Sequence, residues 1–137
     1  MRLLFKVPSM RKLSTIITLS AIVMAIPSFA AANQLSGEEI RNTISGKKVY
    51  LATRWGIEFP LIYRGNGRVT GDGTGTGLGK YFAPKETGRW WVKNDRMCQK
   101  FPTWYKGRTF CFKLEENGSR GLIWKRDDGA SGRARIG

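Results

Sequence analysis

Short turns divide most of this chain into strand-length segments, and their spacing limits what the chain can fold into. From residue 47 onward, runs rich in β-branched and aromatic residues alternate with turn residues of the kind found in antiparallel hairpins. The expected strands are 47–53, 58–64, 68–70, 88–93, 96–101, 108–114, 120–126 and 130–136. About eight short strands joined by short loops predict a mainly β fold, an antiparallel meander that closes as a small up-and-down barrel or forms a strongly curved sheet.

A short helix is expected ahead of the strands. Ser36 stands three residues before Glu39, which is the spacing of a capping box, and Leu35 and Ile40 occupy the positions of a hydrophobic staple. Gly46 is expected to end the helix. We expect this helix to cover one end or edge of the sheet.

The first 30 residues are typical of a secretory signal peptide. A basic start without acidic residues precedes an apolar stretch at 16–26, and small residues follow. Cleavage is expected after Ala30 or Ala32, and a complete signal also begins at Met10. The apolar stretch is too short for a membrane span, so no transmembrane segment is expected after cleavage. Residues 33–137 are expected to form a single periplasmic or secreted domain.

Cys98 and Cys111 are the only cysteines, and both lie in the exported part. Two such cysteines are expected to pair in an oxidising compartment. The loop centred on Trp104 and Tyr105 sets them opposite each other on neighbouring strands, as a cross-strand disulfide requires.

The turn signals also predict how the later strands align. Asn117-Gly118 and Asp128-Gly129 are typical of two-residue hairpin turns, and Asn94-Asp95 is a further turn. These turns predict a row of facing residues across four hairpins: Trp91, Cys98, Cys111, Trp124 and Arg133.

Alternation along each strand then assigns two faces. The predicted core face carries Trp90, Val92, Met97, Phe101, Phe110, Phe112, Leu114, Ile123, Ala134 and Ile136. The other face holds the cysteine pair, Leu122 and many cations, which cannot be buried without partners. We therefore predict an exposed anion-binding face made of Arg89, Trp91, Arg96, Trp124, Arg126, Arg133 and Arg135.

Two interpretations of this face are open. Arginines bind phosphate, sulfate or carboxylate groups, and tryptophans stack on ligands, so the face suits an anionic partner. Like charges that face each other destabilise a sheet, and Arg96 faces both Lys93 and Lys113 in the predicted register. Alternatively, these are solvated strand faces on which the tryptophans and cysteines pack under arginine stems.

The segment at 71–80, GDGTGTGLGK, is not a phosphate-binding loop. Lys80 is followed by Tyr81, and Thr74 stands where the first glycine of that motif belongs. Asp72 is the segment's only carboxylate, which is too few for calcium. We expect a mobile loop or a weak edge strand that binds no nucleotide.

The composition favours a non-catalytic binding protein without metal or cofactor. The chain has no histidine, which excludes a Ser-His-Asp triad and histidine metal ligands. Four of the 24 basic residues lie in the signal and all 10 acidic residues lie outside it, which leaves a mature net charge of about +10. Basic and aromatic residues interleave as in nucleic-acid modules, but export argues against that partner.

The expected partner is therefore an anionic polysaccharide, lipopolysaccharide or an acidic protein. One alternative is a periplasmic enzyme inhibitor of the lysozyme-inhibitor type, although basic lysozymes would repel so basic an inhibitor. The other alternative is a lipocalin-like barrel that binds a small molecule.

A family resemblance agrees with the fold. The series LSGEEIR at 35–41, GRWWV at 88–92 and DRMC at 95–98, followed by Cys111, resembles small exported bacterial proteins grouped as a domain of unknown function. The Gly-x-Trp and two-cysteine pattern is also similar to lipocalin-like barrels. The resemblance implies an exported β fold with a disulfide, and it carries over no activity and no site residue.

Overall fold

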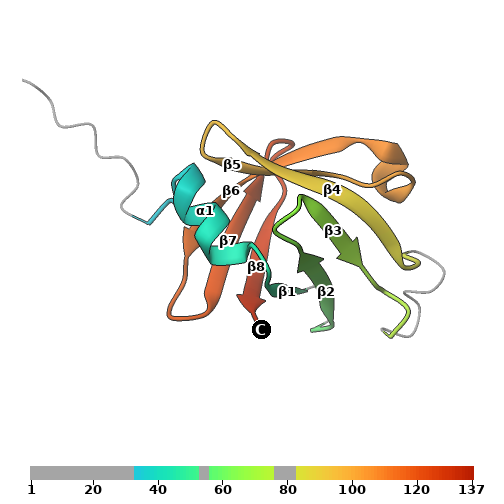
Figure 1. The fold of residues 1–137 in the computed structure, drawn as a ribbon. Helices are drawn as coiled ribbons and strands as arrows, with labels where there is room; N and C mark the ends of the chain where they lie inside the picture. The colour runs from blue at the N-terminus through green and yellow to red at the C-terminus, as the bar shows by residue number, and fades with distance from the viewer. Residues whose placement is uncertain (1–32, 53–55, 76–82) are drawn as a thin grey trace, which may run out of the picture.

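The computed structural model describes residues 33–52, 56–75 and 83–137, and in these residues the predicted mainly β fold is confirmed. Helix α1 (Gly37–Ile44) precedes eight antiparallel strands that close into a barrel in chain order (Figure 1). The strands are β1 (Lys48–Ala52), β2 (Glu58–Tyr63), β3 (Arg68–Gly71), β4 (Glu86–Lys93), β5 (Arg96–Lys100), β6 (Thr109–Glu116), β7 (Gly121–Arg126) and β8 (Ser131–Ile136). A 3-10 helix, η1 (Trp104–Gly107), connects β5 to β6. The predicted signal peptide, 1–30, lies outside the described residues.

The capping box predicted for α1 is confirmed. The Glu39 backbone N–H donates to Ser36 Oγ at 3.3 Å, and the Ser36 N–H donates to Glu39 Oε2 at 2.7 Å. Ile40 and Ile44 are buried, and the first turn of the helix meets the β4–β5 turn, where the Gly37 N–H donates to Asp95. Helix α1 therefore covers one end of the barrel, as expected. The opposite end, lined by Ala52, Phe59 and Trp104 among the described residues, is named the mouth.

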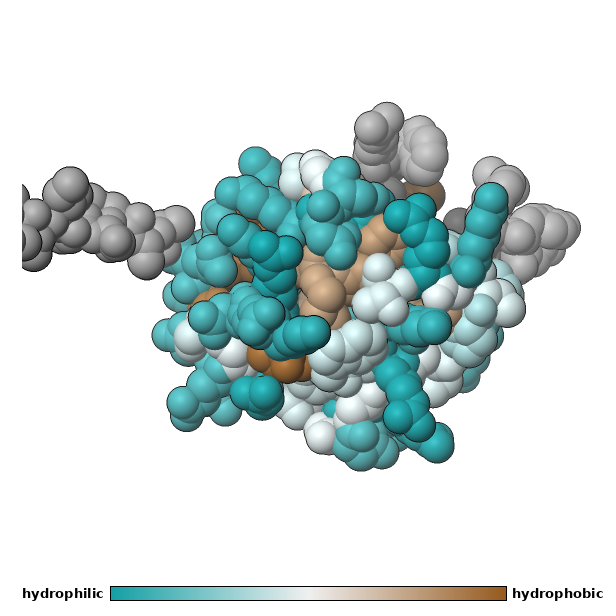
Figure 2. Space-filling view, turned by 90° about the horizontal axis from the view of Figure 1, so that it is seen from above, coloured by the Kyte–Doolittle hydropathy of each residue, from teal (hydrophilic) through white to brown (hydrophobic). Residues whose placement is uncertain are grey.

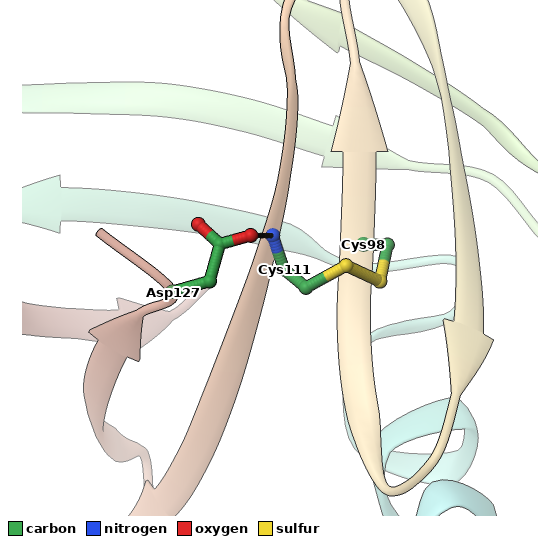
Figure 3. Close-up of a disulfide and its surroundings, with 3 residues drawn as sticks. All are labelled: Cys98, Cys111 and Asp127. Atoms are coloured by element: carbon green, nitrogen blue, oxygen red, sulfur yellow. Dashed lines mark hydrogen bonds between the residues drawn. A yellow bond between two sulfur atoms is a disulfide. The ribbon is translucent and has the colours of Figure 1, made fainter. Parts of the chain in front are cut away.

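The predicted disulfide is also present. Cys98 on β5 and Cys111 on β6 face each other with their Cα atoms 4.0 Å apart. Figure 3 shows the Asp127 carboxylate accepting a hydrogen bond from the Cys111 N–H, at 3.2 Å. The neighbours Met97 and Gln99 line the barrel interior, so Cys98 faces outward, yet only 1% of its surface is exposed. The disulfide thus lies on the outer side, as predicted, but Cys98 is covered.

The predicted register of β7 is wrong. Trp124 faces Leu114 instead of Cys111, because Asn117 N–H donates to the Gly121 carbonyl at 3.0 Å and the loop spans 118–120. This displacement by an odd number of residues turns every β7 side chain to the other face. The side chains of Leu122 and Trp124 therefore point inward, and Ile123, predicted for the core, is replaced there by Leu122.

The β7–β8 hairpin is displaced as well, and this returns the side chains of β8 to their predicted faces. Its loop spans 127–129 and sets Trp124 opposite Gly132, one position from the predicted Arg133. Each of the two hairpins is displaced by an odd number of residues, so together they leave the side chains of β8 on the predicted faces. Ala134 and Ile136 therefore pack against the core as predicted. The remaining predicted core residues also belong to the core or pack against it: Trp90, Val92, Met97, Phe101, Phe110, Phe112 and Leu114.

The start of the glycine run is packed inside the fold. Gly71 ends β3, which lies between β2 and β4, so the prediction of an edge strand is wrong for this residue. The Trp104 indole covers Gly71 so closely that a Cβ there would lie 2.1 Å from the ring. Gly73 is buried against Phe59 in the same way. Positions 76–80 of the run lie outside the described residues.

We expect Gly71→Ala to lower the free energy of unfolding by about 1–3 kcal/mol, because the added methyl group overlaps the indole ring. Gly75→Ala is the matched control, since a Cβ at Gly75 meets no atom of the described residues within 4 Å. Urea denaturation followed by tryptophan fluorescence measures both. Equal stability of the two variants would show that Trp104 does not pack on Gly71.

Removing the disulfide gives a second test of the fold. The double variant Cys98→Ala with Cys111→Ala is expected to have a free energy of unfolding about 3 kcal/mol lower, because the bond no longer restricts the unfolded chain. Urea denaturation of the variant and of the oxidised protein measures the difference. An unchanged midpoint would contradict the expectation.

Candidate functional site

Closure of the barrel separates the predicted anion-binding residues into three groups. Arg89 and Trp91 lie on β4 and Arg96 on β5, while Arg133 and Arg135 lie on β8, four strands away in a barrel of eight. Trp124 and Arg126 lie on β7 and line the interior, because of the register difference described above. The predicted continuous face is therefore wrong, and its β4–β5 part has to be considered by itself.

The outer side of β3, β4 and β5 carries a dense set of cations. Arg68 faces Arg89 across β3 and β4, and Arg89 faces Lys100 across β4 and β5. Nearer α1, Lys93 faces Arg96. Between these two rows lies Trp91, opposite Cys98, with 37% of its surface exposed. We name this surface the basic face: Arg68, Arg89, Trp91, Lys93, Arg96 and Lys100.

A groove follows the row formed by Arg68, Arg89 and Lys100 on the basic face. It measures about 870 Å³ and is lined by Asn66, Gly67, Arg68, Thr87, Gly88, Arg89, Trp90, Trp91, Lys100, Phe101 and Pro102. Figure 2 views the molecule from above Figure 1, where β4 and β5 lie, and shows hydrophilic side chains around a smaller apolar area. The groove thus offers charged rims and an indole surface to one ligand.

The cations of the basic face have no acidic partners in the described part of the chain. The three ion pairs found there are Lys125–Glu115, Arg126–Asp128 and Arg135–Glu58. The side chains of Arg68, Arg89 and Lys100 make no hydrogen bond to any described residue. Facing like charges destabilise a sheet by a few tenths of a kcal/mol or more each, so this face costs the fold stability.

The cations on β8 are in a different situation. The Arg135 guanidinium donates to both oxygens of Glu58 and lies 4.0 Å from the centre of the Tyr50 ring. The same hydrogen bonds hold the pKa of the Glu58 carboxyl below its usual range. Arg135 is thus already paired, and Arg133 is the exposed arginine that remains on this strand.

Arg126 ends β7, lines the inner cavity of the barrel and has a carboxylate partner. Its guanidinium makes two hydrogen bonds of 2.7 Å to Asp128 and stacks 4.2 Å from the centre of the Phe110 ring. This pairing lowers the pKa of Asp128 and raises that of Arg126. The pair is a structural clamp on the β7–β8 turn, and it leaves Arg126 without a free charge for an outer-face ligand.

Sequence reasoning missed the aromatic lining of the mouth. The described residues around it enclose about 370 Å³ and include Phe59, Trp104, Tyr105 and Trp124. Tyr105 and its neighbour Lys106 have φ angles of 53° and 58° in η1. The interleaved aromatic and basic residues were visible in the sequence, but the loop lengths that turn Trp124 inward were not.

The Arg126–Asp128 clamp predicts a pH dependence. Because the folded-state pKa of Asp128 is depressed, the pairing stabilises the fold above the unfolded-state pKa and is lost as pH falls through the folded-state value. Arg126→Met is expected to raise the pKa of Asp128 only in part, since the Ala130 N–H still donates to this carboxylate at 3.2 Å. Lys125→Met is the control, because Lys125 pairs with Glu115. Carboxyl ¹³C titration measures these values, and an Asp128 that titrates in its usual range would contradict the clamp.

Neither a metal site nor a membrane-spanning helix is found among the described residues. No group of three acidic or cysteine side chains suited to a metal ion occurs within the described ranges. None of the helices formed by the described residues is long and apolar enough to cross a membrane. Comparison of the chain with protein-family models, curated proteins and solved structures found no match.

Proposed function

We propose that this protein is a non-catalytic, exported binding protein whose basic face holds an anionic partner. The observation that carries the proposal is the row Arg68, Arg89 and Lys100, which face one another across three strands without an acidic partner among the described residues. Such a row destabilises the free protein. A sulfate, phosphate or carboxylate placed in the groove would remove that repulsion and gain charge-assisted hydrogen bonds.

Trp91 adds a second kind of contact to the same surface. Its ring lies two residues along β4 from Arg89, so both side chains are on the outer face. A half-exposed indole beside arginines suits a ligand that has a ring as well as a negative charge. This combination supports an acidic polysaccharide or the phosphorylated sugars of a lipopolysaccharide, and an acidic protein is the third candidate.

The scaffold beneath the basic face is stiff. The disulfide joins β5 to β6 directly beside Trp91, and Trp90 is anchored from the other side by a 2.8 Å hydrogen bond from its indole N–H to the Arg64 carbonyl. A ligand that binds to side chains on a rigid sheet loses less free energy to ordering than one that binds to a loop. This rigidity favours the interpretation of the basic face as a binding site over its interpretation as a solvated strand face.

The test uses three probes: dextran sulfate, lipopolysaccharide and poly-glutamate. We expect the wild-type protein to bind at least one of them, more weakly as salt rises, because exposed charges are screened beyond about 8 Å at physiological ionic strength. Arg89→Glu with Lys100→Glu is expected to abolish that binding, because it places two negative charges in the groove. Isothermal titration calorimetry measures the affinities, and the probe that binds identifies the partner class.

The matched control is Lys47→Glu with Arg133→Glu. It changes the net charge by the same amount, and both residues are exposed and lie outside the basic face. If the control double variant loses as much affinity as the groove variant, binding depends on net charge alone and the proposed site is wrong. The proposal also fails if the wild-type protein binds none of the three probes.

A further inference from the structure

The barrel interior contains a buried polar group whose donors have no acceptor among the described residues. Gln99 on β5 is 7% exposed, and its Oε1 accepts a 2.8 Å hydrogen bond from the Tyr63 hydroxyl. Its amide nitrogen carries two further donors, and no described residue accepts from them. A buried donor without an acceptor costs about 1–3 kcal/mol, so such a group in a folded protein calls for an explanation.

Gln99 lies where two spaces meet inside the barrel. An inner cavity of about 70 Å³ and the mouth of about 370 Å³ are both lined by Leu51, Leu61, Gln99, Tyr105 and Trp124. The side chain of Gln99 points inward, on the same face of β5 as Met97. Among the described residues, the amide of Gln99 therefore lines a space that continues from the inner cavity into the mouth.

The walls of the mouth are aromatic, and their own polar atoms are already bound. The indole N–H of Trp104 donates to the Pro84 carbonyl at 3.0 Å, and that of Trp124 donates to the Arg133 carbonyl at 3.3 Å. Phe59 packs edge-on against Trp104, with ring centroids 5.2 Å apart. Trp104 also stacks on Phe101, with ring centroids 4.5 Å apart, so these contacts hold rings that line the mouth.

We propose that the mouth binds a small, flat, uncharged molecule with an aromatic or conjugated body and a carbonyl oxygen that accepts from Gln99. The inner cavity is smaller than the roughly 150 Å³ that holds a benzene ring, so only the carbonyl end fits beside the amide. The mouth exceeds that size, so the ring system packs there against the lining side chains of Phe59, Trp104 and Trp124. The charge of Arg126 is balanced by Asp128, so the site favours a neutral ligand.

This site is distinct from the basic face. None of the six residues of the basic face lines the mouth or the inner cavity. The proposal of a neutral ligand in the mouth is therefore independent of the proposal of an anionic partner on the basic face.

The experiment uses ¹⁵N-labelled protein and naphthalene-2-carboxamide, a neutral two-ring amide, as the probe. We expect the side-chain NH₂ signals of Gln99, assigned by their loss in Gln99→Met, to shift in a saturable way. Gln34 is the internal control, because it lies at the α1 end of the barrel beside Glu115. Gln99→Met is expected to bind the probe about three- to tenfold more weakly, while 2-methylnaphthalene, which has no carbonyl, binds both proteins equally.

Two further variants keep the test decisive. Ala52→Trp, at an exposed position that lines the mouth, is expected to block the probe even if Gln99→Met does not fold. Arg89→Glu with Lys100→Glu is expected to leave probe binding unchanged. The proposal is overturned if the probe leaves the Gln99 signals unmoved up to millimolar concentration, or if Gln99→Met binds it as tightly as the wild type. It is equally overturned if the amide shows cross-peaks only to water in the presence of probe, because a buried water then satisfies the donors.

Discussion

Pairing of β8 with β1 is the constraint on which the rest of this structure depends. Three facing pairs join the strands, from Val49–Ile136 to Leu51–Ala134, and remove the free edges that an open sheet of this sequence would present. The exposed Arg135–Glu58 pair crosses the same seam over the Tyr50 ring. Exposed ion pairs add little stability, so the backbone ladder and the enclosed core carry the closure.

Closure also decides which cations can act together. In an open sheet, the arginines of β4 and β8 would lie on one continuous surface, whereas in a closed barrel of eight strands they lie on opposite sides. A single ligand then meets either the basic face or Arg133, not both. Among the described residues, Arg68, Arg89 and Lys100 are cations without an ion pair that face one another across β3, β4 and β5, and this concentration makes that side the candidate site.

The parts of the structure that were predictable from sequence are those fixed by local chemistry. The capping box of α1, the strand order and the disulfide follow from residues close together in the chain, and the Cys98–Cys111 pair sets its register correctly. The register of β7 was not predictable in the same way, because Asn117-Gly118 fits a two-residue turn as well as the longer loop that closes at Gly121. The inward position of Trp124, and with it the mouth, depends on that one loop. The basic face was predicted in part, since Arg89, Trp91 and Arg96 lie on it, but Arg68 enters only through the β3–β4 pairing.

The two proposed sites share strand β5, and the physical reason they stay separable lies in the pleat. Gln99 points into the barrel and Lys100 points out, so adjacent residues serve opposite faces of the same strand. The disulfide at Cys98 and the ladder to β4 and β6 hold the backbone between them in place. We therefore expect a charge change at Lys100 to act on the outer face and to leave the buried Tyr63–Gln99 hydrogen bond intact. A rigid strand of this kind can carry two independent binding surfaces in one small barrel, one selecting for charge and the other for shape and a single hydrogen bond.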